Sequence, residues 1–269
     1  MEVDDGSLVP KLRYLATGAR QPVEARATLH YSIRGHGPYE VREEGDLVAT
    51  LGRPDDVLYV VYQRCHARLL DHLTLGSWAG IHAGVVGVAG RRALVVGDKG
   101  AGKTTLLLRL LHDGHRVEGD ELVLFRSRAA VCLPRNFHVK PGTPALIPEL
   151  AAHWDRLPAT TMSDGTVITA FDPSAAGFDW RVDLAPVDVV FVLRPDHGGT
   201  ASCRALGALE LARAVLARAF PTPLPARDLL RACSALVEGT DGYELTVGEV
   251  QATADLLVHS CRDAPTPRC

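Results

Sequence analysis

Short apolar runs bounded by glycines come first along the chain, and a longer segment with helical spacing follows them. The runs at 29–34, 39–42 and 47–51 predict three short strands separated by glycine turns. Residues 55–73 carry apolar positions at helical spacing, and Asp55 and Asp56 lie near the expected helix start. We therefore expect a small α+β lead-in over residues 1–75.

From residue 76 onward, strand-like apolar runs alternate with helix-like segments, as in α/β proteins. The strand-like runs lie at 81–88, 92–96, 115–119, 130–133, 187–193 and 243–247. The helix-like segments lie at 103–113, 144–157, 205–220, 225–237 and 249–259. This order predicts a main α/β domain over residues 76–262 and a frayed tail at 263–269.

A glycine-rich loop joins the predicted strand 92–96 to the helix that follows it. Gly97, Gly102, Lys103 and Thr104 satisfy the spacing G-x-x-x-x-G-K-[ST]. Such a loop turns backbone N–H groups inward around phosphates, and the helix N-terminus adds partial positive charge. Lys103 would reach the β- and γ-phosphates, and the Thr104 hydroxyl would ligate Mg²⁺. The predicted ATP-binding residues are Gly97, Asp98, Lys99, Gly100, Ala101, Gly102, Lys103, Thr104 and Thr105; the alternative is a chance match in a glycine-rich loop.

An acidic pair, Asp120 and Glu121, follows one helix and one strand after this loop. A ten-residue helix leads away from the phosphates by roughly 15 Å, and a five-residue strand leads back by roughly 16 Å. The pair should therefore return to the mouth of the loop. One carboxylate there could hold Mg²⁺ and the other could accept a proton from an attacking hydroxyl. The alternative is a solvated acidic turn.

The order of these motifs resembles the HPr kinase/phosphorylase family and its HPr-kinase-like relatives. The matching residues are Ile81-His-Ala-Gly84, the glycine-rich loop, and Gly-His-Arg-Val-Glu-Gly-Asp-Glu-Leu-Val at 114–123. That family phosphorylates a serine of a carrier protein with ATP and Mg²⁺. The resemblance implies an α/β fold with a P-loop and a mixed sheet of the HPr kinase/phosphoenolpyruvate carboxykinase type.

The resemblance also implies roles for individual residues. Lys103 and Thr104 would bind nucleotide and metal, Asp120 would be the catalytic carboxylate, Glu121 the metal partner, and His82 an active-site histidine. The second acid is Glu121 where the family usually has Asp. Residues 122–142 contain no Gly-rich Glu-x-Arg-Gly segment like that of the bifunctional members, so the resemblance is to a kinase-only relative.

One histidine and three cationic residues are further candidates for the active site, and each also has an explanation that involves no function. His82 lies in an apolar strand pattern, where a histidine is often a packed core residue. Arg135 and Lys140 lie in a loop-like run at 134–142, and their charges could steady a transferring phosphate. Arg194 ends the predicted strand 187–193. The alternative for all three cations is an exposed position in a surface loop or at a strand end, where the charge is solvated. Of the three, Arg135 is predicted to be catalytic.

Composition narrows the class of protein. The 269 residues are 46% hydrophobic and 23% charged, which is ordinary for a globular protein. A net charge of −3 argues against nucleic acid as a partner, and the absence of an 18-residue apolar run argues against a membrane span. The N-terminus is acidic, unlike a signal peptide. No pair of cysteines forms C-x-x-C, so we expect free thiols, no zinc and a cytoplasmic protein.

The sequence therefore predicts a kinase that uses ATP and Mg²⁺ to phosphorylate a hydroxyl group, with serine or threonine of a peptide or protein as the favoured acceptor. Two alternatives stay open: a kinase for a small-molecule hydroxyl, and a nucleotide-binding regulator without phosphotransfer. The sequence leaves open the acceptor, the choice between ATP and GTP, residual phosphorolysis, and whether the protein is a homo-oligomer.

Overall fold

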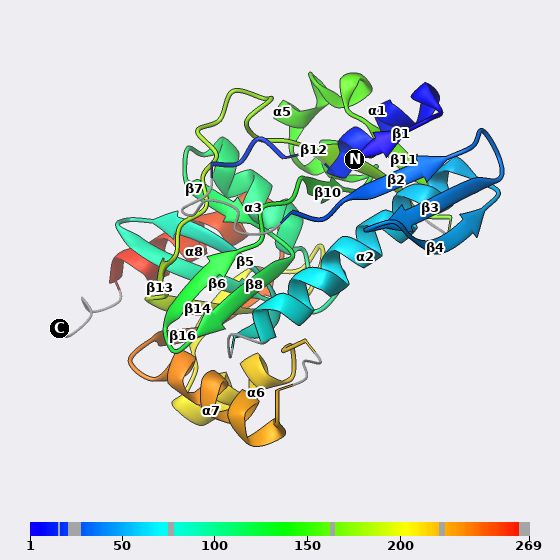
Figure 1. Ribbon diagram of the computed structural model, residues 1–269. Helices are drawn as coiled ribbons and strands as arrows, with labels where there is room; N and C mark the ends of the chain where they lie inside the picture. The colour runs from blue at the N-terminus through cyan, green and yellow to red at the C-terminus, as the bar shows by residue number, and fades with distance from the viewer. Residues whose placement is uncertain (16, 21–27, 75–77, 162–164, 221–223, 264–269) are drawn as a thin grey trace.

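Three β-sheets form the framework of the protein in a computed structural model (Figure 1), which describes all residues except 16, 21–27, 75–77, 162–164, 221–223 and 264–269. The largest sheet contains β5 (Ala79–Val88), β6 (Arg91–Val96), β7 (Arg116–Gly119), β8 (Leu122–Arg126), β9 (Ala129–Cys132), β13 (Ala185–Pro186), β14 (Val189–Pro195), β15 (Ser202–Ala205) and β16 (Asp241–Val247). Its order is β13-β9-β8-β5-β6-β14-β16-β15, and β7 also pairs with β5. β14 runs parallel to both β6 and β16, whereas β5 is antiparallel to its neighbours. The predicted α/β class with a mixed sheet is confirmed; the HPr-kinase type of this sheet stays a prediction.

Two smaller sheets accompany the large one. The first contains β1 (Glu2–Val3), β2 (Tyr31–Arg34), β3 (Tyr39–Glu43) and β4 (Asp46–Leu51). The second contains β10 (Phe137–Val139), β11 (Ala159–Thr161) and β12 (Val167–Phe171). The helices are α1 (Val9–Leu12), α2 (Pro54–Thr74), α3 (Lys103–His112), α4 (Thr143–Leu146), α5 (Pro148–Ala151), α6 (Ala208–Leu216), α7 (Ala226–Val237) and α8 (Val250–Asp263). Three 3-10 turns lie at Gly6–Leu8, Arg13–Leu15 and Trp154–Arg156.

Helices cover both faces of the large sheet. Alternate strand residues point to opposite faces, so Val95 of β6 packs with α3 and α8, whereas Leu94 packs with α6 and α7. Figure 1 shows α6 and α7 on one side of the strands and α3 and α8 on the other. This two-sided burial explains why all of β6 is buried and why residues 93–96 are apolar without alternation.

A third core joins α2 to β2 and β3. Ile33, Val41, Val57 and Val61 are fully buried in it, and Ala170 of β12 packs into the same cluster. The second small sheet therefore packs against the lead-in. The division into domains at residues 75 and 76 stays a prediction, because that boundary lies outside the described residues, as do residues 264–269 of the predicted tail.

Two predicted helices are wrong in extent. Residues 144–157 form α4, α5 and a 3-10 turn instead of one helix, because Ile147 has φ −134° and ψ 85° just before Pro148. The predicted helix 205–220 is shortened to α6, which spans 208–216. Residues 218–220 instead bond to the edge of β5, with the N–H of Phe220 donating to the carbonyl of Gly80 at 2.8 Å.

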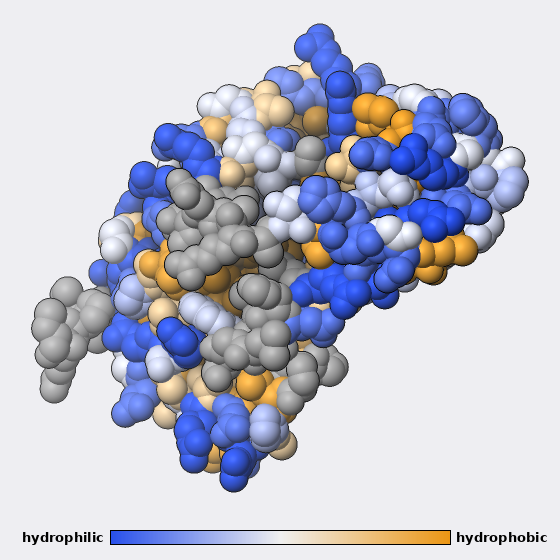
Figure 2. All heavy atoms as spheres, viewed as in Figure 1, coloured by the Kyte–Doolittle hydropathy of each residue, from blue (hydrophilic) through white to orange (hydrophobic). Residues whose placement is uncertain are grey.

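The visible surface of the molecule carries both hydrophilic and apolar side chains. Hydrophilic side chains cover most of it, and apolar side chains gather in small separate patches (Figure 2). In the part of the chain that the structure describes, no helix combines the length and apolarity needed to cross a membrane.

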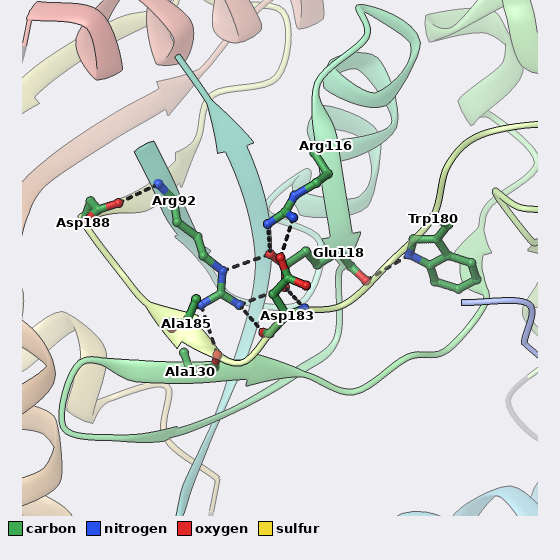
Figure 3. A network of polar contacts seen from close by, with 8 residues as sticks. All are labelled: Arg92, Arg116, Glu118, Ala130, Trp180, Asp183, Ala185 and Asp188. Atoms are coloured by element: carbon green, nitrogen blue, oxygen red, sulfur yellow. Dashed lines mark hydrogen bonds and ion pairs between the residues drawn. The ribbon is translucent and has the colours of Figure 1, made fainter. Parts of the chain in front are cut away.

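A buried ion network joins β6 to β7 (Figure 3). Glu118 of β7 is fully buried and accepts two bonds from the Arg92 guanidinium of β6, at 2.8 and 2.9 Å. Arg116 pairs with the same carboxylate at 3.0 Å, and the indole N–H of Trp180 donates to the Glu118 carbonyl at 3.0 Å. β6 leads into the glycine-rich loop and β7 leads into the acidic pair, so this network holds together the two strands that build the site.

We expect Glu118→Gln to lower the free energy of unfolding by about 3 kcal/mol, because it removes the charge that compensates two arginines in a buried pair. Denaturant unfolding followed by circular dichroism measures the loss. Arg231→Gln is the matched control, since its ion pair with Asp228 is exposed and should contribute less than about 0.5 kcal/mol. Equal losses in the two variants would contradict a structural role for the buried network.

Candidate active site

The glycine-rich loop runs from the end of β6 to the start of α3. Gly100 and Gly102 have φ values of +87° and +91°, in the region that favours glycine, and Gly102 is the N-cap of α3. A Cβ atom at Gly97 would lie 3.1 Å from the Cβ atoms of Ala101 and Leu193, which is tighter than usual. The loop therefore needs glycine at these positions for its conformation and its packing.

Lys103 is the first residue of α3, and its side chain turns back into the loop. Only 5% of the residue is exposed, and its Nζ donates to the carbonyls of Gly97 at 2.6 Å and Asp98 at 3.1 Å. Burial lowers the pKa of Lys103, and the nearby carboxylates Glu121 and Asp120 oppose that shift. The ammonium group thus lies inside the loop, close to the acids.

Asp120 lies against the start of α3, between β7 and β8. It is 3% exposed, and the Thr104 hydroxyl donates to its Oδ2 at 2.6 Å. Arg135 approaches its other oxygen at 3.4 Å. Burial raises the pKa of the Asp120 carboxyl, and the positive charge of Arg135 offsets part of the rise. The acidic pair does return to the loop, as its spacing indicates.

Glu121 faces a different set of partners. Its Oε2 lies 3.2 Å from Arg135 Nη2 and 3.5 Å from His82 Nε2. Burial would raise the pKa of Glu121, but the hydrogen bond with His82 and the charge of Arg135 outweigh it and hold the pKa at about 2. Glu121 is therefore ionised at neutral pH. His82 thus contacts one of the acids, and its role as an active-site histidine stays a prediction.

Arg135 connects the acids to α2 and the second small sheet. Its Nη1 lies 3.3 Å from the Tyr62 hydroxyl and 3.0 Å from His138 Nε2. Burial, followed by the charge of Arg135, lowers the pKa of His138 to about 2, so its imidazole is neutral. The structure thus brings the predicted Arg135 to both acids. Lys140 and Arg194 are exposed, and no side-chain contact with the acids or the loop is found for them among the described residues.

Three residues at the site were missed by sequence reasoning. Tyr62 and His138 contact Arg135, and Arg218 forms an ion pair with Asp98 of the loop at 2.9 Å. Tyr62 lay within a predicted helix and His138 beside Arg135, but nothing in the spacing connected either to the acids. Arg218 had no sequence signal, because it lay inside a segment predicted to be helical.

A cavity of about 490 Å³ adjoins the N-terminus of α3 on the side of β16 and α8. Its walls include Gly102, Thr105, Leu106, Leu146, Val247 and Val250. Most of this lining is apolar, while Gly102 and Thr105 belong to the glycine-rich loop. The cavity is therefore continuous with the loop.

Oxygen ligands suitable for Mg²⁺ are found at Thr104 and Asp120. Mg²⁺ in phosphate-binding proteins takes only one or two carboxylates, with phosphate and water oxygens completing its shell. The hydroxyl and carboxylate, 2.6 Å apart, fit that donor set. Among the described residues, no three His, Cys, Asp or Glu side chains form a metal-binding group. The five cysteines in this part of the chain are free thiols, as expected.

Comparison with known proteins does not assign this chain to a family. No protein-family model matches the sequence, and no curated protein matches it. Among solved structures, the chain is similar to the Hpr(Ser) kinase/phosphatase from Coxiella burnetii, with a TM-score of 0.34 and 11% identity over 68% of this chain and 94% of that chain. Likeness at this level assigns neither a family nor an activity.

Proposed function

We propose that the protein is a kinase that uses ATP and Mg²⁺ to phosphorylate a hydroxyl group, with serine or threonine of a peptide or protein as the favoured acceptor. The observation that carries this proposal is the 2.6 Å contact between Thr104 and Asp120, which joins the glycine-rich loop to the acidic pair. A loop that only bound nucleotide would not need two carboxylates, a histidine and an arginine beside it. A small-molecule hydroxyl is the second class of acceptor that this site would serve.

The nucleotide is bound along the loop and the adjoining cavity. Backbone N–H groups of the loop and the N-terminus of α3 bind the phosphates, and Lys103 contacts the β- and γ-phosphates. Base and ribose occupy the cavity beside Gly102 and Thr105, since its apolar walls suit an aromatic ring. This arrangement directs the γ-phosphate toward Asp120 and Glu121.

Thr104 and Asp120 hold Mg²⁺ in this proposal, because their oxygens already lie together. When bound, the ion offsets negative charge on the phosphate oxygens. This assignment differs from the one made from sequence, which gave the metal to Thr104 and Glu121 and the proton to Asp120. The contacts of Glu121 with His82 and Arg135 support a place for Glu121 on the side of the acceptor.

Phosphoryl transfer then proceeds with Glu121 orienting the acceptor hydroxyl. The hydroxyl oxygen forms a bond to the γ-phosphorus, the bond to the β–γ bridging oxygen breaks, and ADP leaves. Glu121 accepts the hydroxyl proton, and its partner His82 can take the proton further. Because a carboxylate with a pKa of about 2 is a weak base, its main contribution is to position the hydroxyl.

Incubation with γ-labelled ATP, Mg²⁺ and a panel of peptide and metabolite hydroxyls tests the proposal. We expect label to move to at least one acceptor, and mass spectrometry identifies the modified group. Bound but untransferred ATP across a broad panel would favour a nucleotide-binding regulator.

The nucleoside cavity predicts a separate effect of Ala145→Trp. Ala145 is an exposed residue in the cavity wall, so an indole there should fill the space meant for the base. We expect affinity for ATP to fall roughly tenfold, or about 1.4 kcal/mol, while affinity for inorganic triphosphate stays unchanged. Calorimetry measures both. Ala151→Trp, at an exposed position of α5 outside the cavity lining, is the control; equal losses for ATP and triphosphate would place the base elsewhere.

A further inference from the structure

Arg218 reaches the glycine-rich loop because the chain after α6 bonds to the edge of β5. The N–H of His82 donates to the Arg218 carbonyl at 3.2 Å, and the N–H of Phe220 donates to the Gly80 carbonyl at 2.8 Å. Ala219 lies opposite Ile81 in the same short antiparallel pairing. The backbone of Arg218 is therefore fixed beside His82, whose ring contacts Glu121.

The side chain of Arg218 is largely buried, and its hydrogen bonding is incomplete. It is 17% exposed, and its Nη2 pairs with Asp98 of the loop at 2.9 Å. Its Nη1 donates to the Ala214 carbonyl at 3.1 Å, whereas Nε is buried and has no partner. Each Nη nitrogen carries two N–H groups, so this partly exposed guanidinium has donors left for a further acceptor.

Two cations meet at one residue of the loop. Lys103 donates to the Asp98 carbonyl, and Arg218 pairs with the Asp98 carboxylate. Burial lowers the pKa of Lys103, and the charge of Arg218 adds to that effect. The Asp98 side chain is 71% exposed and is a weak counter-ion for this pair. Among the described residues, Arg218 pairs with no carboxylate other than Asp98, and a triphosphate bound to the loop would supply a stronger anion.

We propose that Arg218 binds the γ-phosphate of the nucleotide and stabilises its charge during transfer. This assignment rests on the proposed function and adds a catalytic residue to it. The Arg218 side chain shares Asp98 with Lys103, the proposed ligand of the β- and γ-phosphates, and the Arg218 backbone bonds to His82 on the proposed acceptor side. As the bond between the γ-phosphorus and the bridging oxygen breaks, negative charge spreads over oxygens that an arginine fork can bind in pairs.

A structural tether between Arg218 and Asp98 is the competing explanation, and the two make different predictions. If Arg218 binds the γ-phosphate, its loss should affect ATP and leave ADP unaffected. If the ion pair only shapes the loop, Arg218→Gln and Asp98→Asn should weaken both nucleotides by the same factor.

The experiment compares Arg218→Gln, Arg218→Lys and Asp98→Asn, with Arg213→Gln as the control. Arg213 is an exposed arginine of α6 five residues earlier. Calorimetry gives the ATP and ADP affinities, and γ-labelled ATP gives the rate of transfer. We expect Arg218→Gln to lower the ratio of ATP to ADP affinity at least tenfold and the rate by roughly 10³-fold. Arg218→Lys, which keeps a charge without the fork, should lie between it and the wild type.

The wild-type arm reports on the proposed function and the variants report on Arg218. Wild-type protein that binds ATP but transfers no phosphate would contradict the kinase proposal, and the affinity ratio would still test Arg218. An unchanged ratio in Arg218→Gln, or equal losses for ATP and ADP in Arg218→Gln and Asp98→Asn, would overturn the assignment.

Discussion

Lys103→Met should lower the rate of phosphoryl transfer by roughly 10³-fold, since a buried cation aimed at transferring phosphate oxygens gives that scale of stabilisation. ATP affinity should fall by roughly 10- to 100-fold, because a charged hydrogen bond contributes about 1.5–3 kcal/mol. The Lys103 side chain is buried, with 5% of the residue exposed. Methionine nearly preserves the length of that side chain, so the packing beside α3 should be retained. Calorimetry measures affinity and labelled ATP measures transfer.

Lys140→Met is the control for this prediction. Lys140 is an exposed lysine after β10, and its loss should leave ATP affinity and the rate unchanged. Circular dichroism establishes that both variants are folded. A folded Lys103→Met protein with wild-type ATP affinity would remove the phosphate-binding loop from the proposed function.

Asp120→Asn and Glu121→Gln should separate metal binding from positioning of the acceptor. Asp120→Asn removes the charge beside Thr104, so we expect a higher Mg²⁺ concentration for half-maximal rate and a rate loss of roughly 10³-fold at fixed Mg²⁺. Glu121→Gln should lower the rate by roughly 10²-fold with an unchanged Mg²⁺ requirement. Titrations of rate against Mg²⁺ measure both quantities, and the reverse pattern would restore the assignment made from sequence.

The pH dependence of the Mg²⁺ requirement gives a second test of the same roles. Burial raises the pKa of Asp120 above its ordinary value, and protonated Asp120 cannot bind the ion with its full charge. The Mg²⁺ concentration for half-maximal rate should therefore rise as the pH falls through this raised pKa. Glu121, with a pKa of about 2, should not titrate in the same range. Asp120→Asn should abolish the acid-side rise, whereas Glu121→Gln should retain it.

Local sequence by itself determined the parts of the site that are close together in the chain. The strand, glycine-rich loop and helix at 91–112 follow from apolar runs and from glycines whose positive φ values are needed at Gly100 and Gly102. The return of the acidic pair follows from one helix and one strand of nearly equal length. Both depend only on short-range geometry, so the fold class and the meeting of Thr104 with an acid could be predicted.

Only the tertiary structure decided which acid meets Thr104 and which cations join it. Asp120 and Glu121 are adjacent, and the pairing of β7 and β8 with β5 sets the side to which each points. Arg135 is brought to the acids by contacts with Tyr62, 73 residues away. Arg218 arrives because residues 218–220 bond to the edge of β5 instead of continuing a helix. Such long-range pairing leaves no periodic pattern in the local sequence, because a strand edge satisfies backbone groups whatever side chains they carry.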